Sequence, residues 1–350
     1  MISDFAIIDI MTIIKPAIVR VDASTVCQLR CTSCPTTAGA IDTFVGTGFL
    51  KLSDFRHLIE NNRFIKRVEL TNWGEIFLNP ELLDIIKYAY EQSVELVALN
   101  GVNFNTVKPE VLEALVKYRF RAISVSIDGA TQSTYEKYRV RGHLETVLGN
   151  IRKLNDYKKQ YRSSRPELQW QYVVFGHNEH EIEQARALAT ELGMRFQPKL
   201  NWENMYDLPF SAVQDKELAR RVLGAADREE FHQKHNKHFC SVVCGEMWTS
   251  PQVSFDGKVL GCPVNHWSSF GNAFEEPLVD IVNGERMNYA RSMLAGQAPE
   301  RDDIPCTRCK VYQSIKEHGT WIKPPEIQPE QPTNDNVRVR RNIARGYDTF

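Results

Sequence analysis

Apolar runs alternate with helix-like segments from residue 17 to about residue 200. Near-continuous apolar runs indicate strands buried on both faces, and apolar residues that recur every three to four positions indicate helices packed against them. The pattern predicts strands at 17–22, 67–71, 94–100, 122–128, 168–175 and 194–200. It predicts helices at 53–63, 80–92, 108–118, 143–160 and 179–192. Six such units in succession predict an α/β fold with a parallel sheet, open or closed into a barrel, whose ligands bind at the carboxyl ends of the strands.

Three residues predict where helices begin. Ser53 is a candidate N-cap, because its hydroxyl can accept a hydrogen bond from a backbone N–H of the first turn. Pro80 and Pro109 are suited to a first turn, because proline has no N–H that a helix start would leave unpaired.

The chain changes character after the sixth predicted strand. Residues 1–200 carry the repeated units, whereas residues 201–239 are polar and charged and are predicted to form a linker. Residues 240–322 contain five of the eight cysteines and are predicted to form a small second domain, in which the Asp-Gly pair at 256–257 predicts a hairpin. Residues 323–350 are rich in Pro, Gln and charge, so we expect them to be a disordered tail outside the core.

The overall charge is balanced. The 43 Lys and Arg nearly equal the 44 Asp and Glu, so no bulk field favours nucleic acid or an anionic membrane surface. The N-terminal segment lacks the pattern of a signal peptide, and no apolar stretch is as long as a membrane span. We therefore expect a cytoplasmic protein with neither a nucleic-acid nor a membrane partner.

The cysteines occur in groups, which favours metal binding over a disulfide framework. Cys27, Cys31 and Cys34 have the spacing C-x3-C-x2-C and directly follow the first predicted strand. Three thiolates do not complete a structural zinc site without a fourth ligand. An iron–sulfur cube held by three thiolates leaves one iron free to bind a small molecule. An iron with an open coordination position indicates a catalytic site. The alternative is that these three cysteines form a structural zinc loop.

This motif, in the loop after a first strand, resembles the signature of the radical SAM superfamily. The resemblance covers residues 17 to about 320. It implies a partial (βα)6 TIM-like barrel and a [4Fe-4S] cluster whose open iron binds S-adenosylmethionine. Reductive cleavage of that cofactor gives a 5′-deoxyadenosyl radical, which abstracts a hydrogen atom from a substrate. The resemblance also implies an electron donor such as flavodoxin or ferredoxin.

A second segment resembles the stretch in which this family holds the methionine amino group of the cofactor. The sequence TNWGEIFLNPEL follows the second predicted strand, where the family has Gly-Gly-Glu-Pro. Gly74 and Glu75 match that pattern, whereas Trp73 and Ile76 replace the usual glycine and proline. The resemblance therefore implies that Gly74 and Glu75 bind the cofactor.

Further cofactor contacts are expected at the ends of other strands. In SVSIDGATQSTYEKYRVRG, Ser126 and Asp128 are implied contacts of the ribose, and Arg139 of the methionine carboxylate, for which a guanidinium fork is suited. Asn100 and Asn178 are further candidates for the ribose or adenine. For each of these polar residues the alternative is a cap or turn partner at a strand end.

Four later cysteines could close a second site. Cys244, Cys262, Cys306 and Cys309 have the spacing C-x17-C-x43-C-x2-C, which serves either a zinc ion or a fully ligated [4Fe-4S] cluster. The spacing resembles that of the twitch domain, a shortened relative of SPASM with one auxiliary [4Fe-4S] cluster. It is especially similar to that of 2-deoxy-scyllo-inosamine dehydrogenases, which oxidise a secondary alcohol.

Cys240 belongs to neither set. It is a spare ligand, a buried apolar residue or a catalytic thiol. In radical SAM peptide epimerases, a cysteine outside the clusters returns a hydrogen atom to the substrate radical.

Three functions are open at this point. The first is radical SAM oxidation of a sugar- or aminocyclitol-like metabolite, with the auxiliary cluster as electron acceptor. The second is epimerisation or crosslinking of a ribosomally synthesised peptide, so the substrate is a small molecule or a peptide. The third is a non-enzymatic metal-binding module.

Overall fold

The computed structural model describes residues 13–41, 43–201 and 209–324, and these contain one parallel sheet. The order of the strands is β6-β5-β4-β3-β2-β1-β7. Their bounds are β1 Ile18–Val21, β2 Arg67–Glu69, β3 Glu95–Val102, β4 Ala122–Ser126, β5 Glu167–Val174, β6 Arg195–Leu200 and β7 Gln252–Val253. Strands β1 to β6 neighbour one another in chain order, as expected of successive βα units joined by right-handed crossovers.

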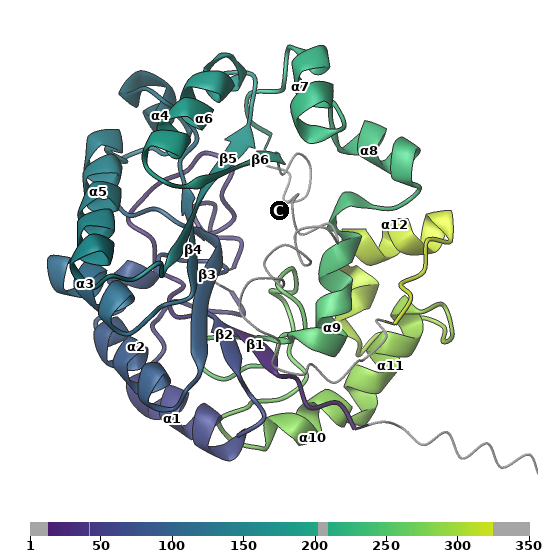
Figure 1. Cartoon of the computed structure of the whole chain (residues 1–350). Helices are drawn as coiled ribbons and strands as arrows, with labels where there is room; N and C mark the ends of the chain where they lie inside the picture. Colours follow the sequence, from purple (N-terminus) through teal and green to yellow (C-terminus); the bar gives the residue numbers. More distant parts are fainter. Residues whose placement is uncertain (1–12, 42, 202–208, 325–350) are drawn as a thin grey trace, which may run out of the picture.

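Helices cover the outer side of the arc formed by β1 to β6 (Figure 1). They are α1 Leu52–Asn61, α2 Leu82–Glu91, α3 Pro109–Lys117, α4 Gln132–Tyr138, α5 Leu144–Gln160 and α6 Ile182–Glu191. The six predicted strands and five predicted helices are confirmed, with ends that differ by a few residues. Helix α4 was not predicted. It begins at an N-cap, Thr131, whose side chain accepts a hydrogen bond from the N–H of Thr134. The fold is thus a partial barrel of six βα units, as the resemblance implied.

Two of the three predicted helix starts are wrong. Pro80 lies before Glu81, the N-cap of α2, and so outside the first turn. The N-cap of α1 is Lys51, so Ser53 lies inside the first turn. The N–H of Leu52 instead donates to the Glu81 carboxylate at 2.7 Å, so a tertiary contact replaces the local cap. Pro109 is the first residue of α3, as predicted.

The chain after β6 is more structured than a linker. Between residues 209 and 239 it forms α7 Lys216–Leu223 and α8 Arg228–His235. The following region contains α9 Glu246–Thr249, α10 Leu278–Asn283, α11 Glu285–Leu294 and α12 Lys310–His318. Short 3-10 turns complete the order at Ile76–Leu78, Glu179–Glu181, Phe239–Gly245 and Pro305–Arg308. Most of the predicted tail, from residue 325 onward, lies outside the described residues.

The C-terminal region joins the barrel sheet directly. Strand β7 pairs in parallel with β1, with Gln252 opposite Arg20 and Val253 opposite Val21. The predicted hairpin follows β7: Val253 pairs antiparallel with Val259, and Gly257 turns the chain with φ +90, a conformation that glycine adopts readily. This pairing fixes the C-terminal region against the open side of the arc, between β1 and β6 (Figure 1).

One continuous hydrophobic core includes residues from both regions. Val19 and Val68 of the barrel and Val259 and Ile315 of the C-terminal region are fully buried in it. Burial of an aliphatic side chain of this kind contributes about 1.5–3 kcal/mol to folding. Within the described part of the chain, no helix has the length and apolar character needed to cross a membrane.

Candidate active site

A cavity of ≈ 380 Å³ lies inside the arc of strands. Side chains at alternate positions of a strand share one face, so every second residue of the strands points into it. The residues that do so on β2, β5 and β6 are Arg67, Glu69, Gln169, Gln171, Val173, Arg195, Gln197 and Lys199. Loops after β1, β2 and β3 and the segment 240–264 complete the wall. Polar and charged groups of these three strands therefore line part of the interior, where a closed barrel has apolar layers.

The first three cysteines lie together in the wall of this cavity. Cys31 is buried, whereas Cys27 and Cys34 are partly exposed, and all three line the cavity. They pack against one small cluster that includes Leu29 and Phe175. A turn orients the last two, because the N–H of Cys34 donates to the carbonyl of Cys31 at 3.2 Å.

The thiols are chemically suited to bind iron. Burial, together with the nearby Glu75 carboxylate, raises the pKa of Cys27 to about 12, and burial raises that of Cys31 to about 11 despite the Arg139 cation beside it. These raised pKa values favour the protonated thiols when no metal is bound. A cationic iron–sulfur core favours the thiolates, because it binds them. No group of three or more His, Cys, Asp or Glu in the described ranges is arranged around a single metal ion. A cube does not require that arrangement, because each thiolate binds a different iron.

Gly74 and Glu75 lie beside the cysteine loop and also line the cavity. Glu75 is buried and accepts hydrogen bonds from the N–H groups of Phe77 at 3.2 Å and Asn103 at 2.6 Å. Burial raises the pKa of Glu75 to about 7, although these donors oppose the shift. The N–H of Glu75 donates to the carbonyl of Val26 at 2.8 Å, which ties this segment to the residue before Cys27.

Position 74 requires glycine, because the backbone at Ser24 lies too close to it to leave room for a side chain. A Cβ at this position would lie 2.5 Å from the carbonyl oxygen of Ser24, in the chain that leads to Cys27. We expect Gly74→Ala to displace the loop and to lower the rate of 5′-deoxyadenosine formation by about 10²-fold. Gly149→Ala is the matched control, since a Cβ there meets nothing within 4 Å. In helix α5 the control should instead raise the free energy of unfolding by about 0.5–1 kcal/mol. Equal activity of the two variants would contradict this role of Gly74.

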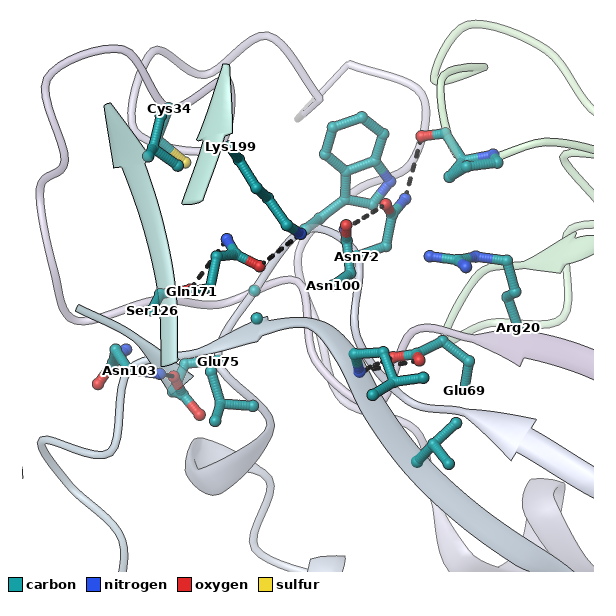
Figure 2. A pocket seen from close by; sticks show the side chains of 18 of the residues that line it. Arg20, Cys34, Glu69, Asn72, Glu75, Asn100, Asn103, Ser126, Gln171 and Lys199 are labelled. Carbon is teal, nitrogen blue, oxygen red and sulfur yellow. Dashed lines mark hydrogen bonds between the residues drawn. The ribbon is translucent and has the colours of Figure 1, made fainter. Parts of the chain in front are cut away.

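Ser126 and Asn100 also reach the cavity. The Ser126 hydroxyl accepts a hydrogen bond from Gln171 at 3.3 Å. The Asn100 amide donates to the Asn72 oxygen at 3.3 Å, and Asn72 in turn donates to the carbonyl of Pro263 at 3.1 Å (Figure 2). A chain of hydrogen bonds therefore connects the end of β3 to the residue after Cys262.

Arg139 lines the cavity as an ion-paired residue. Its Nε donates to the Asp128 carboxylate at 2.5 Å, and its Nη1 lies 3.6 Å from the sulfur of Cys31. Asp128 is fully buried and also accepts a hydrogen bond from the N–H of Val173 at 2.6 Å. The guanidinium thus connects strand β4 to the cysteine loop.

Two of the expected cofactor contacts do not reach the cavity. Asp128 and Asn178 are fully buried and are absent from its described lining. Asn178 accepts a hydrogen bond from the N–H of Phe175 and donates to the carbonyls of Asp128 and Val173. In the structure Asn178 is a turn partner and Asp128 holds Arg139, so the expected contacts of Asp128 with the ribose and of Asn178 with the ribose or adenine stay predictions.

The later four cysteines surround a second, smaller space. Cys244, Cys262, Cys306 and Cys309 all line it. Burial raises the pKa of each thiol, that of Cys262 to about 12, and the neighbouring sulfurs add to the shift for Cys244, Cys262 and Cys306. Four thiols that face one space fit a cluster, in which each thiolate binds a different iron, whereas in the described ranges they are not arranged around a single ion such as zinc.

Cys240 faces the large cavity. It is fully buried, lines the same space as the first three cysteines, and accepts a hydrogen bond from Nη1 of Arg228 at 3.4 Å. Its thiol is therefore on the cavity side of the C-terminal region.

Several cavity residues were not found from the sequence. Lys199, Gln171, Glu69 and Arg20 occupy inward positions of their strands, and period-two alternation would have indicated them. Glu246 forms an ion pair with Arg20 at 3.3 Å, which no local pattern could have revealed because 226 positions separate the two residues.

Two family models match the chain. Residues 22–189 match the radical SAM superfamily, and residues 244–310 match SPASM, an iron–sulfur cluster-binding domain. Fold and thiols thus fit an iron–sulfur protein whose cavity is lined by the first cysteine group and by Val243 and Pro263, the neighbours of Cys244 and Cys262. The chain carries a radical SAM domain at residues 22–189 and a SPASM domain at residues 244–310. These domains imply an S-adenosylmethionine-binding [4Fe-4S] cluster, an auxiliary [4Fe-4S] cluster and S-adenosylmethionine itself, and the two thiol groups fit them.

Known proteins resemble the chain over different lengths. An AdoMet-dependent heme synthase of Methanosarcina barkeri is 29% identical over 181 residues, which are 51% of this chain and 48% of that protein. The chain thus spans about half the length of this curated relative. The fold is similar to that of Streptococcus suis SuiB bound to S-adenosylmethionine, with a TM-score of 0.61 and 12% identity over 85% of this chain and 71% of SuiB. It is also similar to anSMEcpe with bound AdoMet and peptide, with a TM-score of 0.55 and 13% identity over 87% and 96% of the two chains.

Proposed function

We propose that this radical SAM enzyme is an oxidoreductase that converts a C–H bond of a polar alcohol, such as a sugar- or aminocyclitol-like metabolite, into a carbonyl. One observation carries the proposal: a single cavity is lined both by Cys27, Cys31 and Cys34 and by the segment that leads to the later cysteines, including Cys240 and Pro263. A substrate in this cavity would lie between a site that removes a hydrogen atom and a site that accepts an electron.

We assign the roles of the residues from the resemblance to the radical SAM family, and their positions in the wall of the cavity support the assignment. The first three cysteines hold the cluster that, with S-adenosylmethionine, supplies a 5′-deoxyadenosyl radical to the cavity. Gly74 and Glu75 bind the amino group of the cofactor, and Arg139 binds its carboxylate.

The chemistry balances with an auxiliary cluster as oxidant. Conversion of the alcohol to a carbonyl removes one hydrogen atom, one proton and one electron, and Cys244, Cys262, Cys306 and Cys309 would hold an auxiliary cluster able to accept that electron. A low-potential protein such as flavodoxin or ferredoxin would supply the electron that starts each turnover.

The proposal is tested by product analysis on anaerobically purified protein with both clusters intact. With reductant, S-adenosylmethionine and a panel of sugars and cyclitols, we expect 5′-deoxyadenosine and a carbonyl product in equal amounts. Zinc in place of iron, without the nucleoside, would favour the non-enzymatic alternative. Nucleoside without oxidised product from any polar alcohol would contradict the oxidoreductase.

A peptide substrate is the second candidate, and Cys240 favours it. Its buried thiol lines the cavity, where it could return a hydrogen atom to a substrate radical. SuiB, which is similar in fold, has been solved bound to its precursor peptide SuiA.

Cys240→Ala distinguishes the two candidates. If the protein is an oxidoreductase, the variant should keep turnover and the iron content of the wild type, because no thiol hydrogen is needed. If it is an epimerase, turnover should be lost while both clusters remain, and the wild type should place solvent deuterium in the product. Mass spectrometry of product formed in D2O, together with iron analysis of the variant, provides both readouts.

A further inference from the structure

We propose that Lys199 forms an anion subsite in the cavity and that the substrate carries a carboxylate that pairs with it. This inference rests on the proposed function only in taking the cavity as the place where the substrate binds. It narrows the substrate class, because a sugar acid or hydroxy acid then fits better than an aminocyclitol.

Lys199 is a buried cation without a carboxylate partner among the described residues. It lies on β6, is 3% exposed, and lines the cavity. Its Nζ donates to the Oε1 of Gln171 at 2.8 Å, and this amide is itself held by the Ser126 hydroxyl (Figure 2). An ammonium group has three donors, so the single amide oxygen leaves two that a ligand could use.

The other cavity cations with known partners are already paired. Arg20 pairs with Glu246 at 3.3 Å, and Arg139 pairs with Asp128. Arg67 and Arg121 both pair with Glu95 at the opposite end of the strands, at 2.6 and 2.9 Å. Lys199 differs from these four because no carboxylate of the described residues lies within 4.0 Å of it.

The carboxylates close to the cavity already interact with other groups. Of the six cationic side chains that line it, namely Arg20, Arg67, Arg121, Arg139, Arg195 and Lys199, the first four are paired with Glu246, Glu95 and Asp128. Glu69 already accepts hydrogen bonds from donors on and beside its own strand, namely the N–H groups of Thr71 and Leu99 and the Thr71 hydroxyl. A buried cation is costly unless it is paired, so a ligand carboxylate would stabilise the site and a ligand ammonium would be repelled.

Burial also makes the subsite sensitive to pH. It lowers the pKa of Lys199 to about 7; Glu69 of β2 and Asp128 after β4 oppose this shift, and Arg195 and Arg20 add to it. A carboxylate binds the protonated amine, so it should raise the pKa of Lys199. By linkage, its affinity should be full below about pH 7 and should fall by about tenfold in total as the pH passes from the pKa of the free amine to that of the carboxylate-bound amine, about one unit higher.

Small probes test the subsite without knowledge of the substrate. Holoenzyme with both clusters and S-adenosylmethionine is labelled with [13Cε]lysine, and the Lys199 signal is assigned by its absence in Lys199→Arg. Its pKa is measured by NMR at constant ionic strength with acetate, acetamide or ethylammonium, which have similar size and different charge. We expect acetate to raise the pKa of Lys199 by about one unit, and acetamide and ethylammonium to leave it unchanged. An acetate response no larger than that of acetamide would overturn the proposal.

A carboxylate built into the chain provides a second test. Gln171→Glu replaces the amide oxygen that accepts from Lys199 with a carboxylate oxygen at the same place. We expect this variant to raise the pKa of Lys199 on its own and to lose the acetate response, while the exposed Lys153 on α5 is unaffected by acetate in both proteins. Retention of the full response in Gln171→Glu would contradict the pairing. Because no turnover is involved, an acetate response without 5′-deoxyadenosine formation would contradict the proposed function and leave the subsite standing.

Discussion

Replacement of Cys31 by alanine is expected to reduce 5′-deoxyadenosine formation to the level seen without reductant. Cys31 is buried in the cavity wall between Cys27 and Cys34, and without its thiolate the first cluster loses one of three protein ligands. The iron content should fall from about eight to about four atoms per chain, because each cube holds four. Iron and sulfide analysis after anaerobic reconstitution measures this directly.

Cys240→Ala is the matched control for iron content. It removes a thiol that is equally buried in the same wall but belongs to neither predicted ligand set. Its iron content should equal that of the wild type. If the two variants lost the same amount of iron, or if neither lost any, the assignment of Cys31 as a cluster ligand would be contradicted.

The second large effect is expected at the buried ion pair of Arg139 and Asp128. The Asp128 side chain is fully buried and the Arg139 side chain is 14% exposed, so removal of the cation leaves a carboxylate with only the N–H of Val173. We expect Arg139→Met to lower the free energy of unfolding by about 3 kcal/mol, measured by urea denaturation under anaerobic conditions. The exposed pair of Arg152 and Glu145 is the control, and Arg152→Met should cost less than about 1 kcal/mol.

A double-mutant cycle separates the pair from its surroundings. Asp128→Asn combined with Arg139→Met leaves no unpaired buried charge, so the double variant should be less destabilised than the sum of the two single variants. Additive effects would mean that the two residues act independently, in conflict with the 2.5 Å contact.

The βα core could be predicted because its signals are local. An apolar run such as 122–128 identifies a strand wherever it packs, and Pro109 marks a helix start through its own covalent structure. The prediction for Ser53 was wrong for the opposite reason. The N–H of Leu52 donates to Glu81, which lies at the start of a different helix, α2. Strand β7 has only two residues, too few to show an alternation of apolar and polar positions. It forms because it pairs with the edge of β1.

The candidate site likewise contains residues with a local sequence signal and residues whose position depends on tertiary packing. Cys27, Cys31 and Cys34 could be recognised because their spacing lies within one loop. The position of Cys240 in the lining of the same cavity depends on how the C-terminal region packs on the barrel, which no local pattern contains. The resemblance implied cofactor contacts for Asp128 and Asn178, whereas in the structure their side chains form hydrogen bonds with backbone groups and with Arg139, as polar residues at strand ends often do.

Electron paramagnetic resonance of the dithionite-reduced protein, recorded with and without S-adenosylmethionine, tests the central claim most directly. That claim is that one cluster has an open iron at the shared cavity and the other is fully ligated by the protein. We expect two [4Fe-4S]+ signals, of which one changes when the cofactor is added and is missing in Cys31→Ala, while the other stays the same in every sample. If neither signal responded to S-adenosylmethionine, or if the responsive one survived in Cys31→Ala, the account would be contradicted.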